Sequence, residues 1–345
     1  MIKIVLISLF SLISFHGISQ EKPRVFIFTD INIDSGDPDD RQSLVHLFWY
    51  ANELKIEGIV PERWEAKGYE ACIFALNSYS KDYQEFNFKT NGYPEPESLE
   101  KLIAKGTSDV FNLFKKAAEK KDSPLYVLIW GSMLTFNKAF FQYPELAKNI
   151  RIITIGTGTM LEKDYPFLPA GWEKAELPCN QYNWNGFGRN DLFNDSRFND
   201  LWWLEINWTY NGMFSGEEPQ EMFHKLVKFG NMGQHIKEVV KNEAWAQYFR
   251  VGDTPSVLYV IDPNHDVNDP KQSSWAGKSN KPFPDTRPNY YTDFCGNLGW
   301  DYANPCNTWQ IHEQVRDVAA KTLEDRRGEM YEALLQKLSK LYKLK

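Results

Sequence analysis

Five aspartates crowd into eleven residues where an apolar run, residues 24–29, leads directly into a polar loop: Asp30, Asp34, Asp37, Asp39 and Asp40. Carboxylates this close repel one another. At the carboxyl end of a buried strand, such crowding favours a hard, oxygen-binding cation such as Ca²⁺ or Mg²⁺. An acidic surface turn is the alternative interpretation. The strand before the loop and the helical pattern after it favour a site, because open α/β sheets bind ligands at that edge.

The elements that would position this loop follow from hydrophobic periodicity. Leu44, Leu47, Phe48, Ala51 and Leu54 recur at helical spacing, so the order is strand, acidic loop, helix. Further strands are predicted at 56–60, 125–130, 150–155 and 201–206, and helices at 65–80, 108–120, from 134, and at 234–240. This alternation predicts an α/β fold with a doubly wound, mostly parallel sheet in a single domain.

Other segments are less regular. Residues 156–200 and 262–307 are rich in Gly, Asn and Pro and are predicted to be long loops. Residues 256–261 are ambiguous, since β-branched residues favour a strand while Asp253, Thr254 and Pro255 suggest a helix start. Residues 310–344 are predicted to form a long amphipathic helix or helix pair.

Several predicted strand ends carry polar groups that could join the acidic loop in one site. They are the turn 130–132, the turn 156–159, Glu205, Asn207 and Asp253. Carboxyl ends of parallel strands meet at one edge of a sheet, so these groups are expected to converge there. Among the histidines, His265 follows Asp253 in a polar loop and is the candidate for an acid.

The first residues have the pattern of a secretory leader. Lys3 precedes an apolar run at 4–15, and Gly17 and Ser19 are small enough for a cleavage site. We therefore predict a signal peptide at 1–19 and a domain at 20–345 that ends in a helical segment, 308–345. The product would be exported, to the periplasm or outside the cell. The apolar run is too short to span a bilayer, so no stable membrane insertion is expected.

The net charge and the cysteines bear on the possible partners and on disulfide bonds. The net charge is −7 and no basic cluster appears, which argues against nucleic acid as a partner. Cys295 and Cys306 flank a loop whose closure by a disulfide would stabilise the fold by about 3 kcal/mol. Cys72 lies in an apolar helical pattern and Cys179 has no evident partner. A homo-oligomer is left open.

Dispersed motifs resemble the nucleoside hydrolases. Thr29-Asp30 with Asp39-Asp40 resembles their Asp-x-Asp-x-x-x-Asp-Asp motif, and Trp-Gly-Ser-Met-Leu-Thr at 130–135 resembles their Gly-x-Leu-Thr segment. Residues 38–45, 252–259 and 274–278 look more like an uncharacterised exported branch sometimes labelled cellulose-binding. The resemblance spans about residues 23–280.

That resemblance implies roles for individual residues. It implies a Ca²⁺ site with Asp40, the Trp130 carbonyl and Asp253 as ligands, and with Asp30 orienting the loop or ligating. It also implies sugar contacts from Asp39, Glu205 and Asn207.

Two positions depart from the family pattern. Asn32 stands where the family has its water-activating aspartate, and an amide cannot accept the proton. Three extra residues then precede Asp39, so Asp34 or Asp37 takes the role of base or the base is missing. Gly252 stands where nucleoside hydrolases usually have a histidine near the leaving base, which disfavours purine and pyrimidine nucleosides.

The sequence thus predicts an exported Ca²⁺-dependent hydrolase of an O- or N-glycosyl bond in a saccharide or nucleoside-like substrate. Carboxylates near the ring would stabilise an oxocarbenium-like state, and a metal-bound water would attack. The candidate catalytic residues are Asp34, Asp37 and Asp39, and Asn32 is placed among the substrate contacts. The alternative is a non-catalytic carbohydrate-binding protein that keeps the metal site. A metal-free structural Asp loop is a weaker third possibility.

Overall fold

The structure is a computed structural model. It describes residues 21–33, 38–157, 159–161, 181–183, 188–240, 247–298 and 312–343. The predicted signal peptide, Asp34, Asp37, Cys179 and Cys306 lie outside these residues. In the part described, no helix is long and apolar enough to cross a membrane.

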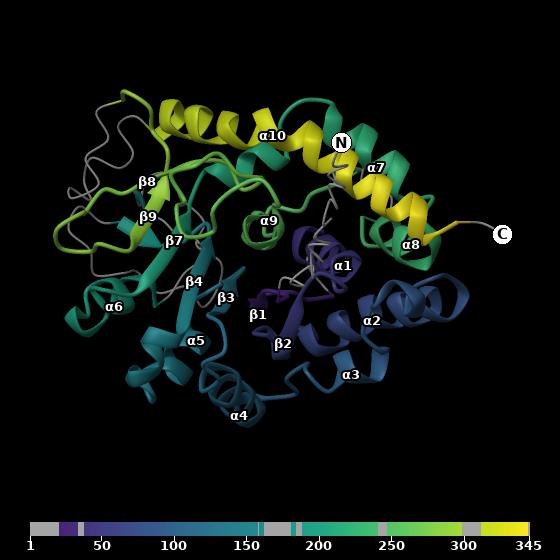
Figure 1. The fold of residues 1–345 in the computed structure, drawn as a ribbon, viewed down its shortest axis with the longest axis horizontal. Helices are drawn as coiled ribbons and strands as arrows, with labels where there is room; N and C mark the ends of the chain where they lie inside the picture. Colours follow the sequence, from purple (N-terminus) through teal and green to yellow (C-terminus); the bar gives the residue numbers. More distant parts are fainter. Residues whose placement is uncertain are drawn as a thin grey trace, which may run out of the picture.

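A twisted sheet forms the centre of the molecule (Figure 1). Its seven strands lie in the order β2 (Lys55–Pro61), β1 (Arg24–Thr29), β3 (Leu125–Ile129), β4 (Ile150–Ile155), β7 (Trp202–Ile206), β9 (Tyr290–Asp293) and β8 (Ser279–Asn280). Every neighbouring pair is parallel except β8 with β9. A separate two-stranded ribbon pairs β5 (Thr159–Leu161) with β6 (Gln181–Asn183). The predicted doubly wound, mostly parallel α/β fold is confirmed.

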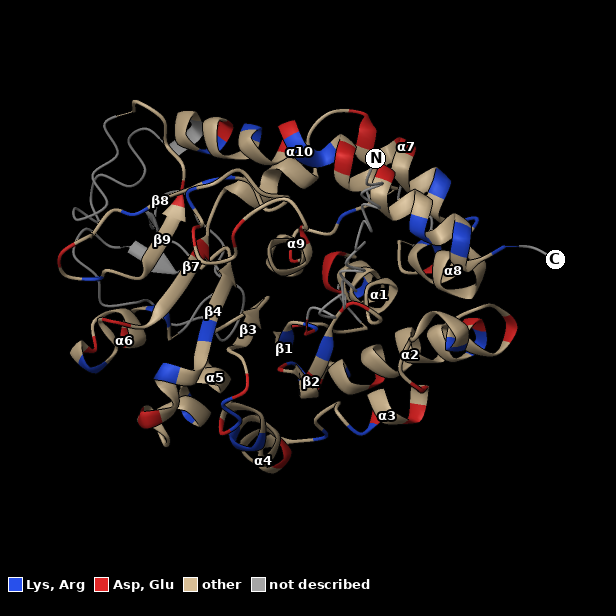
Figure 2. Cartoon of the chain, viewed as in Figure 1, with Lys and Arg blue, Asp and Glu red and all other residues tan. Residues whose placement is uncertain are grey.

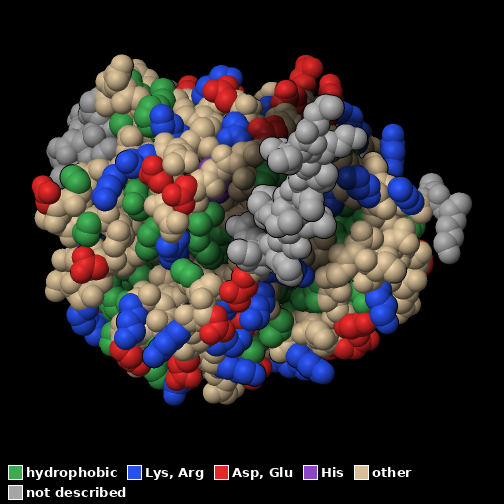
Figure 3. All heavy atoms as spheres, viewed as in Figure 1, with side chains coloured by type: hydrophobic (Ala, Val, Ile, Leu, Met, Phe, Trp, Pro, Cys, Tyr) green, Lys and Arg blue, Asp and Glu red, His purple; other side chains and the backbone are tan. Residues whose placement is uncertain are grey.

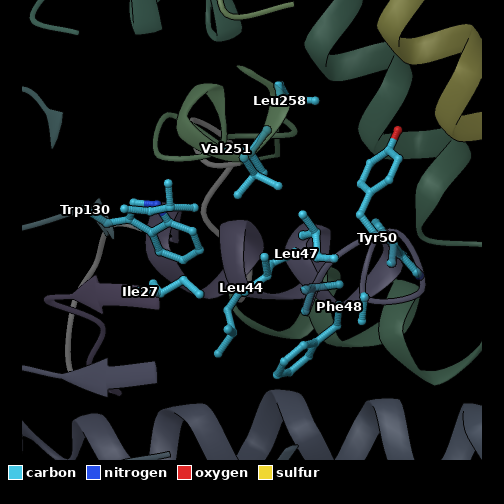
Figure 4. Close-up of a cluster of buried hydrophobic side chains, with 14 of the residues drawn as sticks. Ile27, Leu44, Leu47, Phe48, Tyr50, Trp130, Val251 and Leu258 are labelled. Atoms are coloured by element: carbon cyan, nitrogen blue, oxygen red, sulfur yellow. The ribbon is translucent and has the colours of Figure 1, made fainter. Parts of the chain in front are cut away.

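Helices cover both faces of the sheet because β1 is apolar on both sides. Val25 and Ile27 belong to one hydrophobic cluster, and Phe26 and Phe28 to another. Figure 4 shows Ile27 in the first cluster, among side chains of α1 and Trp130. That face packs against α1 (Asp39–Trp49), α2 (Gly68–Glu85), α3 (Pro96–Glu100), α7 (Glu218–Leu226), α8 (Gly230–Glu238), α9 (Pro255–Ile261) and α10 (His312–Leu341). The other face packs against α4 (Thr107–Ala118), α5 (Leu134–Phe140) and α6 (Arg189–Phe193).

Short 3₁₀ turns connect several of these elements. They are η1 (Trp64–Ala66), η2 (Lys89–Asn91), η3 (Pro144–Asn149), η5 (Ser196–Phe198) and η6 (Thr209–Met213). Two of them, η1 and η6, follow β2 and β7 directly and so lie near the carboxyl edge of the sheet.

The regions predicted as long loops need correction. Residues 262–307 contain β8 and β9, and β9 pairs in parallel with β7 through Trp203 and Tyr290. The local sequence hid this strand, because it is only four residues long and is flanked by Pro and Asn. The region 156–200 contains β5, β6 and α6. The ambiguous segment 256–261 is helical, with Pro255 in the first turn of α9.

The Cys295–Cys306 disulfide is not supported. Cys295 is a free, buried thiol, and its Sγ accepts a hydrogen bond from Asn280 Nδ2 at 3.2 Å. Cys72 is a free, buried thiol in α2, as its apolar pattern predicts.

Charged side chains lie mainly on the outer surfaces of the helices (Figure 2). On the face shown in Figure 3, acidic and basic side chains are interspersed. The start of α1 is different, because Asp39 and Asp40 occupy its first turn, where carboxylates suit the helix dipole.

His46, on α1, is buried as a neutral side chain. It is 1% exposed, and its ring nitrogens have no hydrogen bond among the described residues. The ring packs against Tyr50 and Phe249. Burial lowers the pKa of His46 from 6.5 to about 3.

We expect His46 to make the protein sensitive to acid. The pKa of His46 is lower in the folded chain than in the unfolded chain, so acid protonates the unfolded chain first. The unfolding free energy is therefore unaffected by His46 above about pH 6.5 and decreases as the pH falls from there towards about 3. The loss should approach about 1.4 kcal/mol per pH unit in this window. His46→Phe should flatten the pH dependence of the unfolding free energy measured with urea, whereas His224→Phe, at an exposed position, should not. Equal pH slopes for wild type and His46→Phe would contradict this.

Candidate functional site

The carboxyl edge of the sheet gathers most of the predicted site residues. Asp30, Trp130 and Asn207 each follow the last residue of a strand, and Asp293 ends β9. These strands run parallel in one sheet, so their ends lie on one edge. The indole of Trp130 donates to Ser256 Oγ at 2.8 Å.

The start of α9 is joined to the same edge. Ser256 Oγ, which accepts from Trp130, donates in turn to the main-chain carbonyl of Asp253 at 2.6 Å. Asp253 itself is 4% exposed. The structure thus brings Asp253 close to Trp130 through Ser256, although the two are far apart along the chain.

Asp40 is the most strongly perturbed carboxyl of the edge. Burial raises its pKa well above the usual range, and the neighbouring Asp30 and Asp39 carboxyls raise it further. A hydrogen bond donated by the Thr29 hydroxyl opposes this shift. The Thr29 hydroxyl is itself held in place, because it accepts from Ile31 N at 3.1 Å. A buried carboxyl beside a second carboxyl needs either a proton or a cation.

The close approach of β1 and β3 at this edge requires a glycine. A Cβ at Gly131 would lie 2.9 Å from Asp30 Cβ, so any larger residue would push Asp30 away. Trp130 N donates to Phe28 O at 2.8 Å and keeps the two strands paired up to their ends. Asp30 thus packs against the Trp-Gly-Ser turn at Gly131.

Asp39 is fixed by two donors and closes the space beside Gly252. Its Oδ1 accepts from Ser43 Oγ at 3.1 Å and from Gly252 N at 2.6 Å. A Cβ at Gly252 would lie 2.5 Å from Asp39 Oδ2 and 2.6 Å from Phe214 Cζ. The position where nucleoside hydrolases usually have a histidine is therefore filled by neighbouring side chains.

Tyr210 is a site residue that the sequence did not reveal. It lies in η6 and is 9% exposed. Burial raises its pKa above the usual range, and the carboxyls of Asp39, Asp253 and Asp293 add to the shift. Tyr210 therefore lies among three carboxyls from different elements. Nothing in the local sequence distinguishes it from the other tyrosines.

Glu205 is held in a buried ion pair. Arg189, from α6, donates to both of its carboxylate oxygens at 2.8 Å, and Thr157 Oγ1 donates at 2.8 Å. The Tyr290 hydroxyl donates as well. Burial opposes the charge, but Arg189 and these hydrogen bonds hold the pKa of Glu205 below its usual value. Its predicted sugar contact stays a prediction, since these oxygens already bind protein groups.

Asp293 organises the turn that carries Asn207. Its carboxylate accepts from the backbone N of Asn207 and Trp208, at 3.1 and 2.7 Å, and from Thr209 Oγ1 at 2.8 Å. Burial nevertheless raises the pKa of Asp293 to about 6. The Asn207 Oδ1 atom is buried without a hydrogen bond among the described residues, so it can accept one from a ligand. Asp293 could have been found from the sequence, because it ends a run of aromatic and β-branched residues. The same pattern precedes Asp30.

The sequence singled out two further residues, His265 and Asn32, and the structure places them at different edges of the sheet. His265 lies near the amino-terminal edge, since the loop that follows it binds Arg151, the second residue of β4, through Val267 O and Asn268 Oδ1. Its ring packs on Tyr259, with ring centroids 4.7 Å apart. It is therefore not an acid of this edge. Asn32 lies beside Asp30 and donates from Nδ2 to the Asp30 carbonyl at 3.2 Å.

The atom types available at the edge are those that a hard cation prefers. Asp30, Asp40, Asp253 and the Trp130 carbonyl supply only oxygen atoms, and the raised pKa of Asp40 marks a carboxyl whose charge lacks compensation. Among the described residues, however, no three His, Cys, Asp or Glu side chains are gathered closely enough to hold a metal ion. The structure thus places the Asp30–Asp40 pair, but it does not assemble the full ligand set.

The fold is a mostly parallel α/β sheet with buried aspartates, Asp253 and Asp293, at its carboxyl edge. Residues 24–279 match the family described as cellulose-binding Sde182, nucleoside hydrolase-like domain, and the chain belongs to that family. No curated protein matches the chain.

Two solved structures are similar to the chain, and the first of them supports the fold. A nucleoside hydrolase-related hypothetical protein from Saccharophagus degradans, associated with carbohydrate metabolism, is similar at 19% identity with a TM-score of 0.59, covering 92% of this chain and 72% of that one. An inosine-uridine preferring nucleoside hydrolase from Bacillus anthracis is similar at 12% identity with a TM-score of 0.45, covering 87% of this chain and 100% of that one. Identities this low show a likeness of fold alone.

We expect Gly252→Ala to destabilise the protein by about 1–3 kcal/mol, because the added methyl group must displace Asp39 or Phe214. Urea unfolding followed by circular dichroism measures the effect. Gly328→Ala is the matched control. Its Cβ would meet nothing within 4 Å in α10, so it should leave stability unchanged or raise it by up to about 1 kcal/mol. A loss of similar size in both variants would contradict the packing argument.

Proposed function

We propose that this protein binds a saccharide or nucleoside-like ligand at the carboxyl edge of its sheet, with Ca²⁺ as part of the site. The observation that carries the proposal is the buried Asp40 carboxyl in contact with Asp30. Such a pair is costly unless a cation or a proton compensates it. Family membership under a cellulose-binding description supports a saccharide as the ligand.

The chain's own residues have distinct tasks in this proposal. Asp30, Asp40, Asp253 and the Trp130 carbonyl would hold Ca²⁺, which when bound would supply a positive charge that coordinates sugar hydroxyls. Asp39, fixed by Gly252 N and Ser43, would accept a hydrogen bond from a hydroxyl.

Binding is favoured over cleavage by two features. Asn32 stands at the position of the family's base, and its amide is engaged with the Asp30 carbonyl. At Gly252, Phe214 and Asp39 fill the space that an acid side chain would need. Without an acid near the leaving group, a nucleoside would lose its base slowly.

Glycosyl hydrolysis is the second candidate function. Asp39 favours it, because its carboxylate is fixed, only partly buried and next to the acidic pair, where it could stabilise an oxocarbenium-like state. Asp34 and Asp37 are the candidates for the base. Export to the periplasm or the medium belongs to the same proposal and rests on the leader pattern in the sequence.

Calcium binding is the first measurement. Calorimetric titration of chelator-treated protein with Ca²⁺ should show one site, and Asp40→Asn or Asp253→Asn should weaken it by about 100-fold, or about 2.8 kcal/mol, because each removes a charged ligand. Asp285→Asn, at an exposed position, should leave the affinity unchanged. If wild type binds no Ca²⁺, the proposed metal site is wrong.

Turnover separates binding from cleavage. Wild type should bind cello-oligosaccharides in calorimetry and release no product from p-nitrophenyl glycosides, oligosaccharides or nucleosides. Asn32→Asp should gain measurable hydrolysis because it restores a proton acceptor beside Asp30. Asn77→Asp, on the exposed side of α2, is the control and should gain none. Turnover by wild type would establish hydrolysis instead, with Asp34 or Asp37 as the base to test.

A further inference from the structure

Glu62 follows β2 and lies beside the acidic loop, yet it has no role in the site described above. Pro61 at the end of β2 pairs with Thr29 at the end of β1, and Glu62 N extends this pairing by donating to Thr29 O at 2.8 Å. Figure 1 shows β2 next to β1. The Asp30 carboxyl is close enough to raise the pKa of Glu62.

The Glu62 carboxyl is buried with only partial compensation from the protein. Both of its oxygens are shielded from solvent, and neither forms a well-directed hydrogen bond with a described residue. Burial raises the pKa of Glu62 to about 8, although Thr135 on α5 partly opposes the shift. A buried polar group in this state is costly to the fold, and such groups concentrate where a ligand completes the hydrogen bonding.

The segment around Glu62 carries a second uncompensated polar atom. Trp64 Nε1, in η1, is also buried without a hydrogen bond among the described residues. The segment therefore offers an acceptor and a donor close together in sequence, beside an aromatic ring. This combination suits a ligand with several hydroxyl groups, which both donate and accept.

The segment is held firmly against the acidic loop. Ile33 N donates to Ala66 O at 3.3 Å, and a Cβ at Gly68 would lie 2.8 Å from Ile31 O. Lys67 has the left-handed backbone conformation, with φ of 61°, which is strained for a residue with a side chain. These contacts, together with the hydrogen bond from Glu62 N to Thr29 O, hold the backbone of the segment against the end of β1.

We propose that Glu62 is a ligand-contacting residue, which binds a hydroxyl group of a saccharide lying across the ends of β1 and β2; this rests on the proposed function. A hydroxyl can donate to a carboxylate or accept from a carboxylic acid, so the contact holds in either protonation state. A direct metal contact is the competing role, and the test below separates the two.

The test compares Glu62→Gln and Glu62→Ala with wild type by calorimetry, first with Ca²⁺ alone and then with cello-oligosaccharides. Glu62→Ala should weaken saccharide binding by about 10-fold or more, and Glu62→Gln by less, because the amide still forms a hydrogen bond. Ca²⁺ affinity should change by less than about 2-fold in both. Glu65→Gln, exposed in the same segment, should behave as wild type.

Three other outcomes of this experiment would each contradict part of the proposal. Unchanged saccharide affinity in both Glu62 variants, with binding intact in wild type, would show that Glu62 does not touch the ligand. A large loss of Ca²⁺ affinity would make Glu62 a metal ligand instead. Absence of saccharide binding by wild type would refute the proposed function itself and this inference with it. Glu62→Gln has nearly the shape of the native side chain, so it decides the question if Glu62→Ala fails to fold.

Discussion

The contact between the Asp30 and Asp40 carboxyls at the end of β1 is the constraint on which the rest of the edge depends. Two carboxyls in contact, both only partly exposed, cannot both remain ionised without compensation. The Thr29 hydroxyl offsets only part of this cost. The cost is maintained because β1 lies second in the sheet, paired on both sides, and because the glycine at position 131 leaves room for the Asp30 side chain.

The surrounding edge is rigid for a different reason. Glu205 is fixed by a buried pair with Arg189, and Asp293 fixes the turn at 207–209. Both oxygens of these two carboxylates bind protein groups, whereas the Glu62 oxygens lack a well-directed hydrogen bond among the described residues. The edge thus contains carboxylates that stabilise the fold and carboxylates proposed to bind a ligand. Their hydrogen-bond partners distinguish the two roles better than their residue type does.

Gly252 shows how a likeness of fold can separate from a likeness of activity. The chain shares the fold of nucleoside hydrolases, yet Phe214 and Asp39 occupy the space that an acid side chain would need at this position. The resemblance places Asn32 where the family has its base, which is a second departure. These two departures are the reason why binding is proposed ahead of cleavage.

The sequence by itself determined the alternation of strands and helices and the acidic loop after β1. These features rest on local periodicity and on residues next to strand ends, which are visible along the chain. Only the tertiary structure decided that β9 joins the sheet, that Arg189 neutralises Glu205, that Tyr210 lies among three carboxyls and that His265 faces the other edge. Each of these depends on contacts between residues far apart in sequence, whose energies come from burial and pairing that no local pattern encodes.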